Sequence, residues 1–309
     1  MNRPAQRRSD RGASLLAAIV LIILIGFFGA IAMNLTGTQN SSALNETQSS
    51  QALYIAEGGL EFANRSLAQN LDFYRSTADP IALPATTLGN GSFVVNAFLP
   101  VTLLRTRIPN GTSTNPIRVY ATARFPTSGY LQIDDNLGGA GEFIQYTGIA
   151  ADTFTGVSRD RTINGINGAG TSHERSSRVY PVTTLSTALL NNIGGTSCVP
   201  TTMATSIGIA AHPKFLPAGT ISIASSADPT DPEEIGYAGS TTSGGVITLS
   251  GVVRCLNGTS SAHSVGDPVT SVLVDGGGPD YEASVLSTGT VTIAGLSSAV
   301  RAVRKTVQR

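Results

Sequence analysis

The first pattern in the chain is a long uncharged run near the N-terminus. No charged side chain occurs in residues 13–45, and twelve of the twenty-one residues from Ala13 to Met33 are Leu, Ile, Val or Phe. At about 1.5 Å per residue, a helix over these residues crosses the roughly 30 Å hydrocarbon core of a bilayer. Each of these large apolar side chains favours insertion by about 0.3 to 0.6 kcal/mol. The pattern predicts a membrane-spanning helix over residues 13–33.

A basic segment precedes this run. Four arginines and a single acid, Asp10, occupy residues 1–12. Positive charge next to a membrane span stays on the cytoplasmic side. We therefore expect the N-terminus to stay inside the cell and the chain after Met33 to be exported.

Helical periodicity continues beyond the span. Gly58 and Gly59 interrupt it, and each costs about 1 kcal/mol against alanine, so tertiary packing must hold that turn. The uncharged polar patch Thr36–Ser42 is expected to weaken the helix between its membrane-spanning half and its outer half. The apolar residues step by three or four, as on one face of a helix: Leu53, Ala56, Leu60, Ala63, Leu67 and Leu71.

The rest of the chain has the composition of a β-rich body. The whole chain holds 34 glycines, and only 13% of its residues are charged, as in many short strands joined by turns. Ser92–Leu99 follow a Gly-Asn-Gly turn and read as a strand. Tyr281–Leu286 and Val291–Ala294 are predicted to form a hairpin around Ser287–Gly289, and Val300–Arg309 a last strand.

The middle of the chain is internally duplicated at a period of about ninety residues. Each copy predicts about five short strands, with alternation in Tyr130–Ile133 and in Thr220–Ile223. His173 and His263 close the two copies. The matched residues are Phe125, Pro126, Gly129, Leu131 and Ile133 with Phe215, Leu216, Gly219, Ile221 and Ile223; Glu142, Ile144, Tyr146 and Gly148 with Glu234, Ile235, Tyr237 and Gly239; and Phe154, Gly156, Val157 and Arg159 with Leu249, Gly251, Val252 and Arg254.

Two N-terminal motifs resemble those of type IV pilin-like proteins. Arg11–Leu16 resembles the leader junction of type IV prepilins, and Gln51–Ala63 is similar to the helix signature of PilX-type and MSHA-type minor pilins. The resemblance implies cleavage after Gly12 by a prepilin peptidase and N-methylation of Ala13. It also implies an inner-membrane assembly platform and other pilins in a helical filament as partners, with membrane lipid around the helix before assembly.

One position departs from the pattern of major pilins. Most carry a glutamate five residues into the mature chain, where this sequence has Ala17. A buried carboxylate is destabilising unless it is paired. Its absence therefore removes this desolvation cost, and it also removes an ion pair that would fix the register between neighbouring helices. The resemblance then favours a minor or tip pilin, with a role in pilus assembly and adhesion. The alternatives are a pseudopilin of a type II secretion system, a non-polymerising membrane-anchored adhesin, an uncut signal anchor and, last, an exported hydrolase with an unrecognised site.

The fold expected is α+β. A long N-terminal membrane-spanning helix packs on an antiparallel β-sheet, and two internally duplicated β-rich modules are inserted in that sheet. The expected organisation is a leader at 1–12, the helix at 13–75, the pilin sheet at 76–117 and 273–309, module 1 at 118–182, a linker at 183–205 and module 2 at 206–272.

Charge and cysteine content add little chemistry. Formal charge balances at 20 against 20, and the exported middle is mildly acidic, which gives no support to nucleic-acid binding. Cys198 and Cys255 both fall in the exported part, where oxidising conditions permit a disulfide. Whether they pair or stay as two thiols is left open by the sequence.

No catalytic motif is recognised, so the chain is not expected to be an enzyme and needs no cofactor. None of the three histidines has a Cys, His or acidic residue at a spacing typical of metal ligands. His173 and His263 are matched turn residues of the two copies, so we expect them to be structural. An acidic loop offers weak Ca²⁺ candidates, but its spacing fits no defined calcium loop and solvated turns are preferred. Its members are Asp228, Asp231, Glu233 and Glu234.

Overall fold

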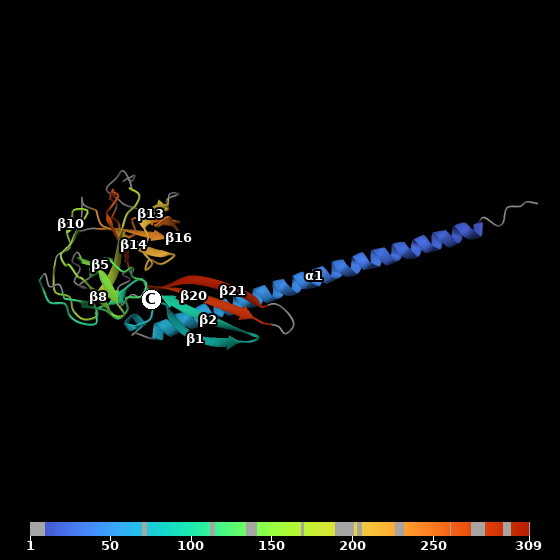
Figure 1. Cartoon of the computed structure of the whole chain (residues 1–309), viewed down its shortest axis with the longest axis horizontal. Helices are drawn as coiled ribbons and strands as arrows, with labels where there is room; N and C mark the ends of the chain where they lie inside the picture. The colour runs from blue at the N-terminus through green and yellow to red at the C-terminus, as the bar shows by residue number, and fades with distance from the viewer. Residues whose placement is uncertain are drawn as a thin grey trace, which may run out of the picture.

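A computed structural model of the chain describes residues 10–69, 73–111, 115–133, 141–167, 170–188, 201–202, 206–225, 232–259, 261–272, 282–292 and 298–308. It has the shape of a rod with a rounded head at one end (Figure 1). We call the part built on the long helix the stem and the two modules the head.

A single helix forms the rod. Helix α1 runs unbroken over Asp10–Gln69, and a short 3₁₀ turn, η1, follows at Phe73–Arg75. The polar patch that was expected to loosen the helix does not interrupt it. The hydroxyls of Thr36, Thr38 and Ser41 donate to backbone carbonyls one turn back, at 2.8 to 2.9 Å. These polar groups are therefore satisfied within the helix itself.

A four-stranded antiparallel sheet completes the stem. Its order is β1-β2-β20-β21, from β1 (Ile81–Leu88), β2 (Gly91–Phe98), β20 (Glu282–Val291) and β21 (Ala299–Gln308). The fold class expected from the sequence is confirmed: a long apolar helix packs on an antiparallel sheet and further antiparallel sheets follow. The hairpin predicted around Ser287–Gly289 is wrong, because β20 passes straight through it and pairs with β2 on one side and β21 on the other.

Small residues at the predicted turn serve close packing instead. A Cβ at Gly289 would overlap the carbonyl oxygen of Ala52 and lie 2.6 Å from the nitrogen of Ala56. A Cβ at Gly59 would overlap the Ser287 hydroxyl. These five residues form what we call the helix–sheet seam, where the backbones of α1 and β20 approach closely. Gly59, which weakens an isolated helix, is thus held by the sheet, as its cost in a helix interior requires.

The outer half of α1 shares one core with the sheet. Ala52, Ala63, Phe93, Val95 and Val285 are among its buried members. Leu60 and Leu67 of the predicted apolar face pack against it, half-buried. Burial of this face, at about 25 cal/mol per Å² of apolar surface, fixes the helix on the sheet.

Nine strands belong to module 1 of the head, and eight to module 2, within the described residues. Module 1 holds β3 (Thr102–Leu103), β4 (Ile117–Arg118), β5 (Gly129–Ile133), β6 (Glu142–Tyr146), β7 (Gly148–Ala150), β8 (Thr153–Thr155), β9 (Thr162–Ile163), β10 (Ile166–Asn167) and β11 (Arg178–Thr184). Module 2 holds β12 (Thr201–Thr202), β13 (Ile207–Ala210), β14 (Gly219–Ile223), β15 (Glu233–Tyr237), β16 (Gly239–Ser243), β17 (Val246–Ser250), β18 (Val253–Arg254) and β19 (Pro268–Val272).

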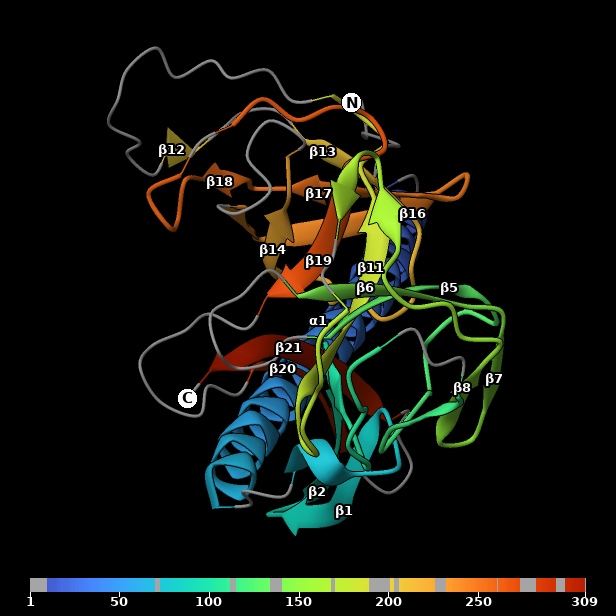
Figure 2. The same cartoon turned by 90° about the vertical axis from the view of Figure 1, so that its left-hand side faces the viewer.

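The two modules share one sheet. Its order is β12-β18-β15-β14-β19-β11-β5-β6, and β3 also pairs with β11. The matched strands β11 and β19 pair antiparallel where the modules meet, with Val182 opposite Thr270 (Figure 2). Because an antiparallel pair of equivalent strands has local twofold symmetry, the two copies are related by an approximate twofold axis at this junction.

Backbone hydrogen bonds show that Leu104 and Leu185 occupy equivalent positions in the two copies, a match that the sequence alignment did not include. Leu104 accepts from Ser176 and donates to Ser177, while Leu185 does the same with Gly266 and Asp267. Each leucine lies in the core of its module. The sequence pattern had placed Leu104 in the pilin-sheet segment and Leu185 in the linker.

The predicted match of Glu142 with Glu234 is wrong by one residue, because Glu233 is the residue at the equivalent place in β15.

Candidate functional site

The inner half of α1 presents its apolar surface to solvent in the isolated chain. From Leu15 to Thr47 every residue is exposed, and Gln48 is the first buried one. Within the described residues, α1 is the one helix long and apolar enough to span a membrane. Gly12 and Ala13 lie in its first turns, and Ala17 is exposed. None of the residues that the structure describes covers this surface, and an apolar surface of this length suits a membrane anchor or a signal sequence.

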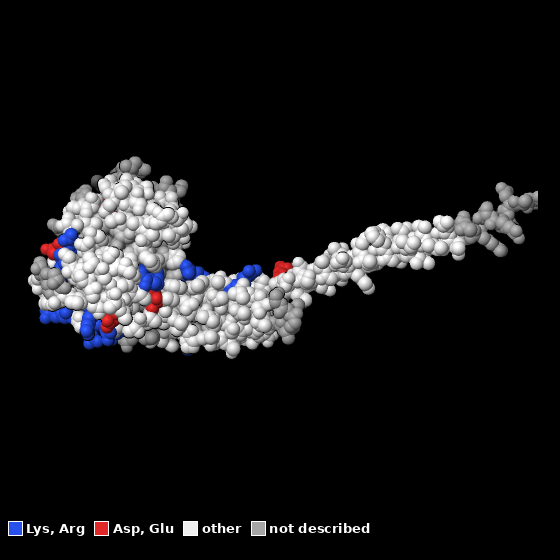
Figure 3. Space-filling view, in the orientation of Figure 1, with Lys and Arg blue, Asp and Glu red and all other residues white. Residues whose placement is uncertain are grey.

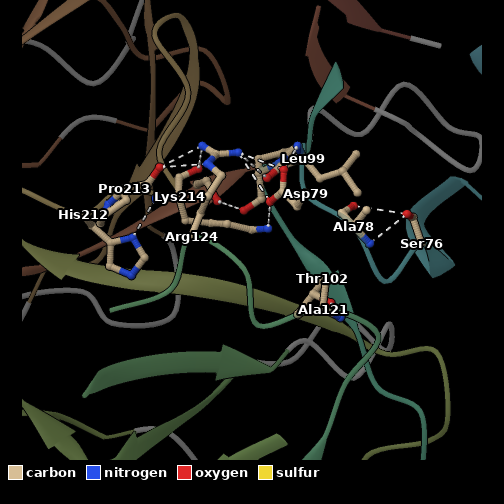
Figure 4. A network of polar contacts seen from close by, with 12 residues as sticks. Ser76, Ala78, Asp79, Leu99, Thr102, Ala121, Arg124, His212, Pro213 and Lys214 are labelled. Carbon is tan, nitrogen blue, oxygen red and sulfur yellow. Dashed lines mark hydrogen bonds and ion pairs between the residues drawn. The ribbon is translucent and has the colours of Figure 1, made fainter. Parts of the chain in front are cut away.

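A buried ionic cluster joins the stem to both modules of the head (Figure 4). At its centre is Asp79, whose side chain is fully buried in the stem. Its carboxylate contacts the ammonium of Lys214 and lies 3.2 Å from the Arg124 guanidinium. The backbone N–H of Leu99 also donates to it at 3.2 Å. Arg124 belongs to module 1 and Lys214 to module 2, so one acid binds a cation from each copy.

The cluster is held together by backbone acceptors as well. Arg124 donates to the carbonyl of Pro213 from Nη2 at 2.8 Å and to that of Lys214 at 3.1 Å. Its guanidinium therefore bridges module 1, module 2 and the stem. A buried charge without such partners would be strongly destabilising.

Burial lowers the pKa of two basic groups at this end of module 2, Lys214 and His212. Burial lowers the pKa of Lys214 to about 8, although the charge of Asp79 acts in the opposite direction. Burial also lowers the pKa of His212 to about 3, and the charges of Lys214 and Arg124 add to this effect. His212 is therefore neutral at pH 7, and its Nδ1 accepts the backbone N–H of Lys214 at 3.1 Å.

Each module contains a buried triad of Glu, Arg and His. In module 1, Arg159 donates from Nε and Nη2 to the two carboxylate oxygens of Glu142, at 2.8 and 2.5 Å. His173 Nε2 lies 2.8 Å from the same carboxylate. Burial alone raises the pKa of Glu142, but the bonds to His173 and Arg159 outweigh it, so the pKa is lowered. The carboxylate is ionised at neutral pH.

The second triad repeats the first. Arg254 donates to both oxygens of Glu233, at 2.7 and 2.5 Å, and His263 Nε2 lies 2.9 Å from that carboxylate. Burial again raises the pKa of the carboxyl, and the bonds to Arg254 and His263 lower it further than burial raises it. These bidentate pairs connect the strands of each module and place the two predicted histidines in buried structural positions.

The acidic loop, for which solvated turns were preferred over a Ca²⁺ site, is not solvated at Glu233, which is fully buried in its triad. That expectation was wrong for this residue, because the carboxylate pairs with Arg254. Glu234 is half-buried in β15; Asp228 and Asp231 lie outside the described residues. Among the residues that the structure describes, no cluster of His, Cys, Asp and Glu could hold a metal ion.

Cys255 is buried and disulfide-bonded. The sequence holds one other cysteine, Cys198, which lies outside the described residues. The pairing of Cys198 with Cys255 stays a prediction.

Sequence reasoning missed the central residue of the ionic cluster. Asp79 has no motif around it. Arg124 and Lys214, however, stand directly before the matched Phe125 and Phe215. If the alignment of the two copies had begun one residue earlier, it would have shown a basic residue before the matched phenylalanine in both copies.

The topology is pilin-like: a long apolar N-terminal helix leaves its first half exposed and packs its second half on an antiparallel sheet. Comparison with protein-family models, curated proteins and solved structures gives no significant match.

Proposed function

We propose that this chain is a minor pilin or pilin-like subunit that polymerises through α1. The observation that carries the proposal is the division of α1 at Gln48, with an exposed apolar half before it and a half buried on the sheet after it. A soluble helix would bury its apolar face against its own chain. The exposed half instead suits lipid before assembly and the helices of neighbouring subunits afterwards.

The prepilin-like junction supports the first step of this pathway. Cleavage after Gly12 and methylation of Ala13 would leave a mature chain that begins with the apolar run. The chain would then remain in the bacterial inner membrane, with a single pass, until the assembly platform draws it into a pilus at the cell surface. Its proposed partners are prepilin peptidase, that platform, lipid and other pilins; we propose no catalytic activity, cofactor or nucleic-acid partner.

The absence of a carboxylate at Ala17 supports a minor rather than a major subunit. No acidic side chain in that turn could pair with the terminal amine of a neighbour, so the helix contributes apolar packing without a charged register contact. Priming of assembly and adhesion through the head fit such a subunit. A pseudopilin of a type II secretion system would use the same helix, and the systems encoded beside the gene separate these two.

The test follows the chain from membrane to filament in its bacterium. Mass spectrometry of the mature protein should find methylated Ala13 at the N-terminus, and sheared surface filaments should contain the protein. A Gly12→Val variant should keep its leader and remain in the membrane fraction. An uncut wild-type chain that never leaves the membrane would favour the anchored adhesin and overturn the proposal.

A further inference from the structure

Module 1 carries an exposed cluster of arginines around one aromatic ring. We call Arg105, Arg107, Arg118, Arg175 and Tyr120 the arginine patch. The four arginines are exposed and the tyrosine is half-buried between them. Figure 3 shows basic side chains at the end of the head that carries β8, away from the beginning of α1 (Figure 1).

The patch is one continuous surface. The backbone N–H of Arg105 donates to the carbonyl of Arg118 at 2.9 Å, so the two residues are cross-strand neighbours with Cβ atoms about 5 Å apart. The guanidinium of Arg105 lies 5.6 Å from the ring centre of Tyr120. Arg175 donates to the hydroxyl of the same tyrosine at 3.2 Å. Tyr120 thereby holds two guanidiniums at fixed positions.

Two acids accompany the four cations. Asp152 binds Arg105 and Glu174 binds Arg107, each at 2.9 Å and each with its side chain more than a third exposed. Four positive charges against two negative charges leave a surplus of two. The contacts already present show that these guanidiniums accept carboxylates as partners, in the fork geometry that suits them.

The second module shows that the fold does not require the patch. Both modules retain the Glu–Arg–His triad and the same backbone bonds: Ser186 N–H donates to Gly208 O as Arg105 N–H donates to Arg118 O. The side chains, however, have diverged. The positions equivalent to Arg105, Arg118, Tyr120 and Arg175 hold Ser186, Gly208, Ala210 and Val265. A cluster that one copy lacks without loss of the fold serves something other than folding.

We propose that the arginine patch binds a carboxylate-bearing polysaccharide, such as a polyuronate. Its position at the far end of the head makes it accessible from outside the cell surface. The modest surplus charge, within a mildly acidic exported chain, suits a polymer with one carboxylate per sugar better than the dense phosphates of a nucleic acid. The inference goes beyond the proposed function, because such binding does not depend on polymerisation of α1.

The test measures binding of the full-length chain, in a neutral detergent, to polygalacturonate, neutral dextran and duplex DNA. The test variant is Arg118→Gln with Arg175→Gln, which leaves both ion pairs of the patch intact. The matched control is Arg301→Gln with Lys305→Gln, which removes two exposed positive charges from β21 of the stem. Asp152→Asn, which raises the surplus charge, is a third variant that misfolding cannot mimic.

The expected result is salt-sensitive binding of polygalacturonate and none of dextran. The test variant should bind about tenfold more weakly, the control should match the wild type within about twofold, and Asp152→Asn should bind about threefold more tightly. No binding by the wild type, or an equal loss in test and control variants, would overturn the proposal. Tighter binding of DNA than of polygalacturonate at equal salt would also overturn it, in favour of a phosphate polymer.

Discussion

Lys214 and Asp79 are in direct contact although 135 positions separate them in the sequence. Both side chains are fully buried. Asp79 lies two residues before β1 of the stem sheet, whereas Lys214 lies early in module 2. The contact therefore fixes the head on the stem at the junction of the two modules, where Arg124 of module 1 binds the same carboxylate.

Replacement of Asp79 by Ala should destabilise the chain strongly. It would leave Lys214 and Arg124 buried without their anion, and breaking a buried pair in this way costs about 3 to 5 kcal/mol. Chemical denaturation of the detergent-solubilised chain measures the loss. As a control, Arg105→Gln breaks an exposed ion pair and should cost less than about 1 kcal/mol.

A double-mutant cycle separates the ion pair from general disruption of packing. Lys214→Met in the Asp79→Ala background should recover part of the stability, because it removes one uncompensated buried charge. A coupling free energy of about 1 to 3 kcal/mol between the two positions is expected. If the effects of the two substitutions on the free energy of unfolding are strictly additive, the contact between Asp79 and Lys214 contributes nothing to stability.

The helix–sheet seam makes Gly289 intolerant of even one methyl group. The Cβ of Gly289→Ala would overlap backbone atoms of α1, which cannot rotate away as a side chain does. We expect a loss of about 1 to 3 kcal/mol, typical of overpacking, and faster proteolysis of the outer half of α1. Gly37→Ala, at a site with nothing within 4 Å of the new methyl, should be neutral or slightly stabilising. Equal behaviour of the two variants would contradict the role of the seam.

The seam also shows where sequence reasoning failed. Ser287–Gly289 are turn-forming residue types, and the pattern alone predicted a hairpin there. Their small size instead admits the backbone of α1, a contact that depends on residues more than 200 positions away. The exposed apolar helix and the duplicated strands were predictable, because periodicity and repetition are local signals. Asp79 was not, since its partners come from three separate parts of the chain.

The one-residue error at Glu233 has a different origin, because the match with Glu234 broke the spacing of the repeat. Glu142 stands two residues before Ile144, and Glu233 stands two residues before the matched Ile235. Regular spacing therefore selects Glu233, which alternation in the strand sends to the same face as Ile235. The structure places Glu233 inside and leaves Glu234 partly exposed.

His212 should make the head sensitive to mild acid. Its pKa is lowered by burial from 6.5 to about 3, so between these values the unfolded chain binds the proton more readily than the folded one. Stability therefore falls as pH drops from about 6.5 toward 3. In His212→Asn, which keeps a side-chain acceptor, the free energy of unfolding should change less between pH 6.5 and 4.5. An unchanged slope in this variant would assign the sensitivity to another group.

The Glu–Arg–His triads should affect the free energy of unfolding at a lower pH than His212 does. The pKa of Glu142 is lowered in the folded state relative to 4.5, so its contribution is fully present above pH 4.5 and is lost as pH falls through the folded-state value. At pH 7, Glu142→Gln should cost about 3 to 5 kcal/mol, because Arg159 stays buried beside a neutral amide. The difference from the wild type should shrink as pH falls below 4.5, because the carboxyl takes up its proton first in the unfolded chain and, at still lower pH, in the folded one.

Glu174→Gln is the matched control for this experiment, because it removes the same charge from an ion pair whose acid is 71% exposed. It should cost less than about 1 kcal/mol at pH 7 and show little added dependence on pH. Denaturant unfolding at pH 7, 5 and 3.5 measures both variants against the wild type. A Glu142→Gln penalty that stays constant down to pH 3.5 would mean that the buried carboxylate, and with it the triad, is not the source of acid sensitivity.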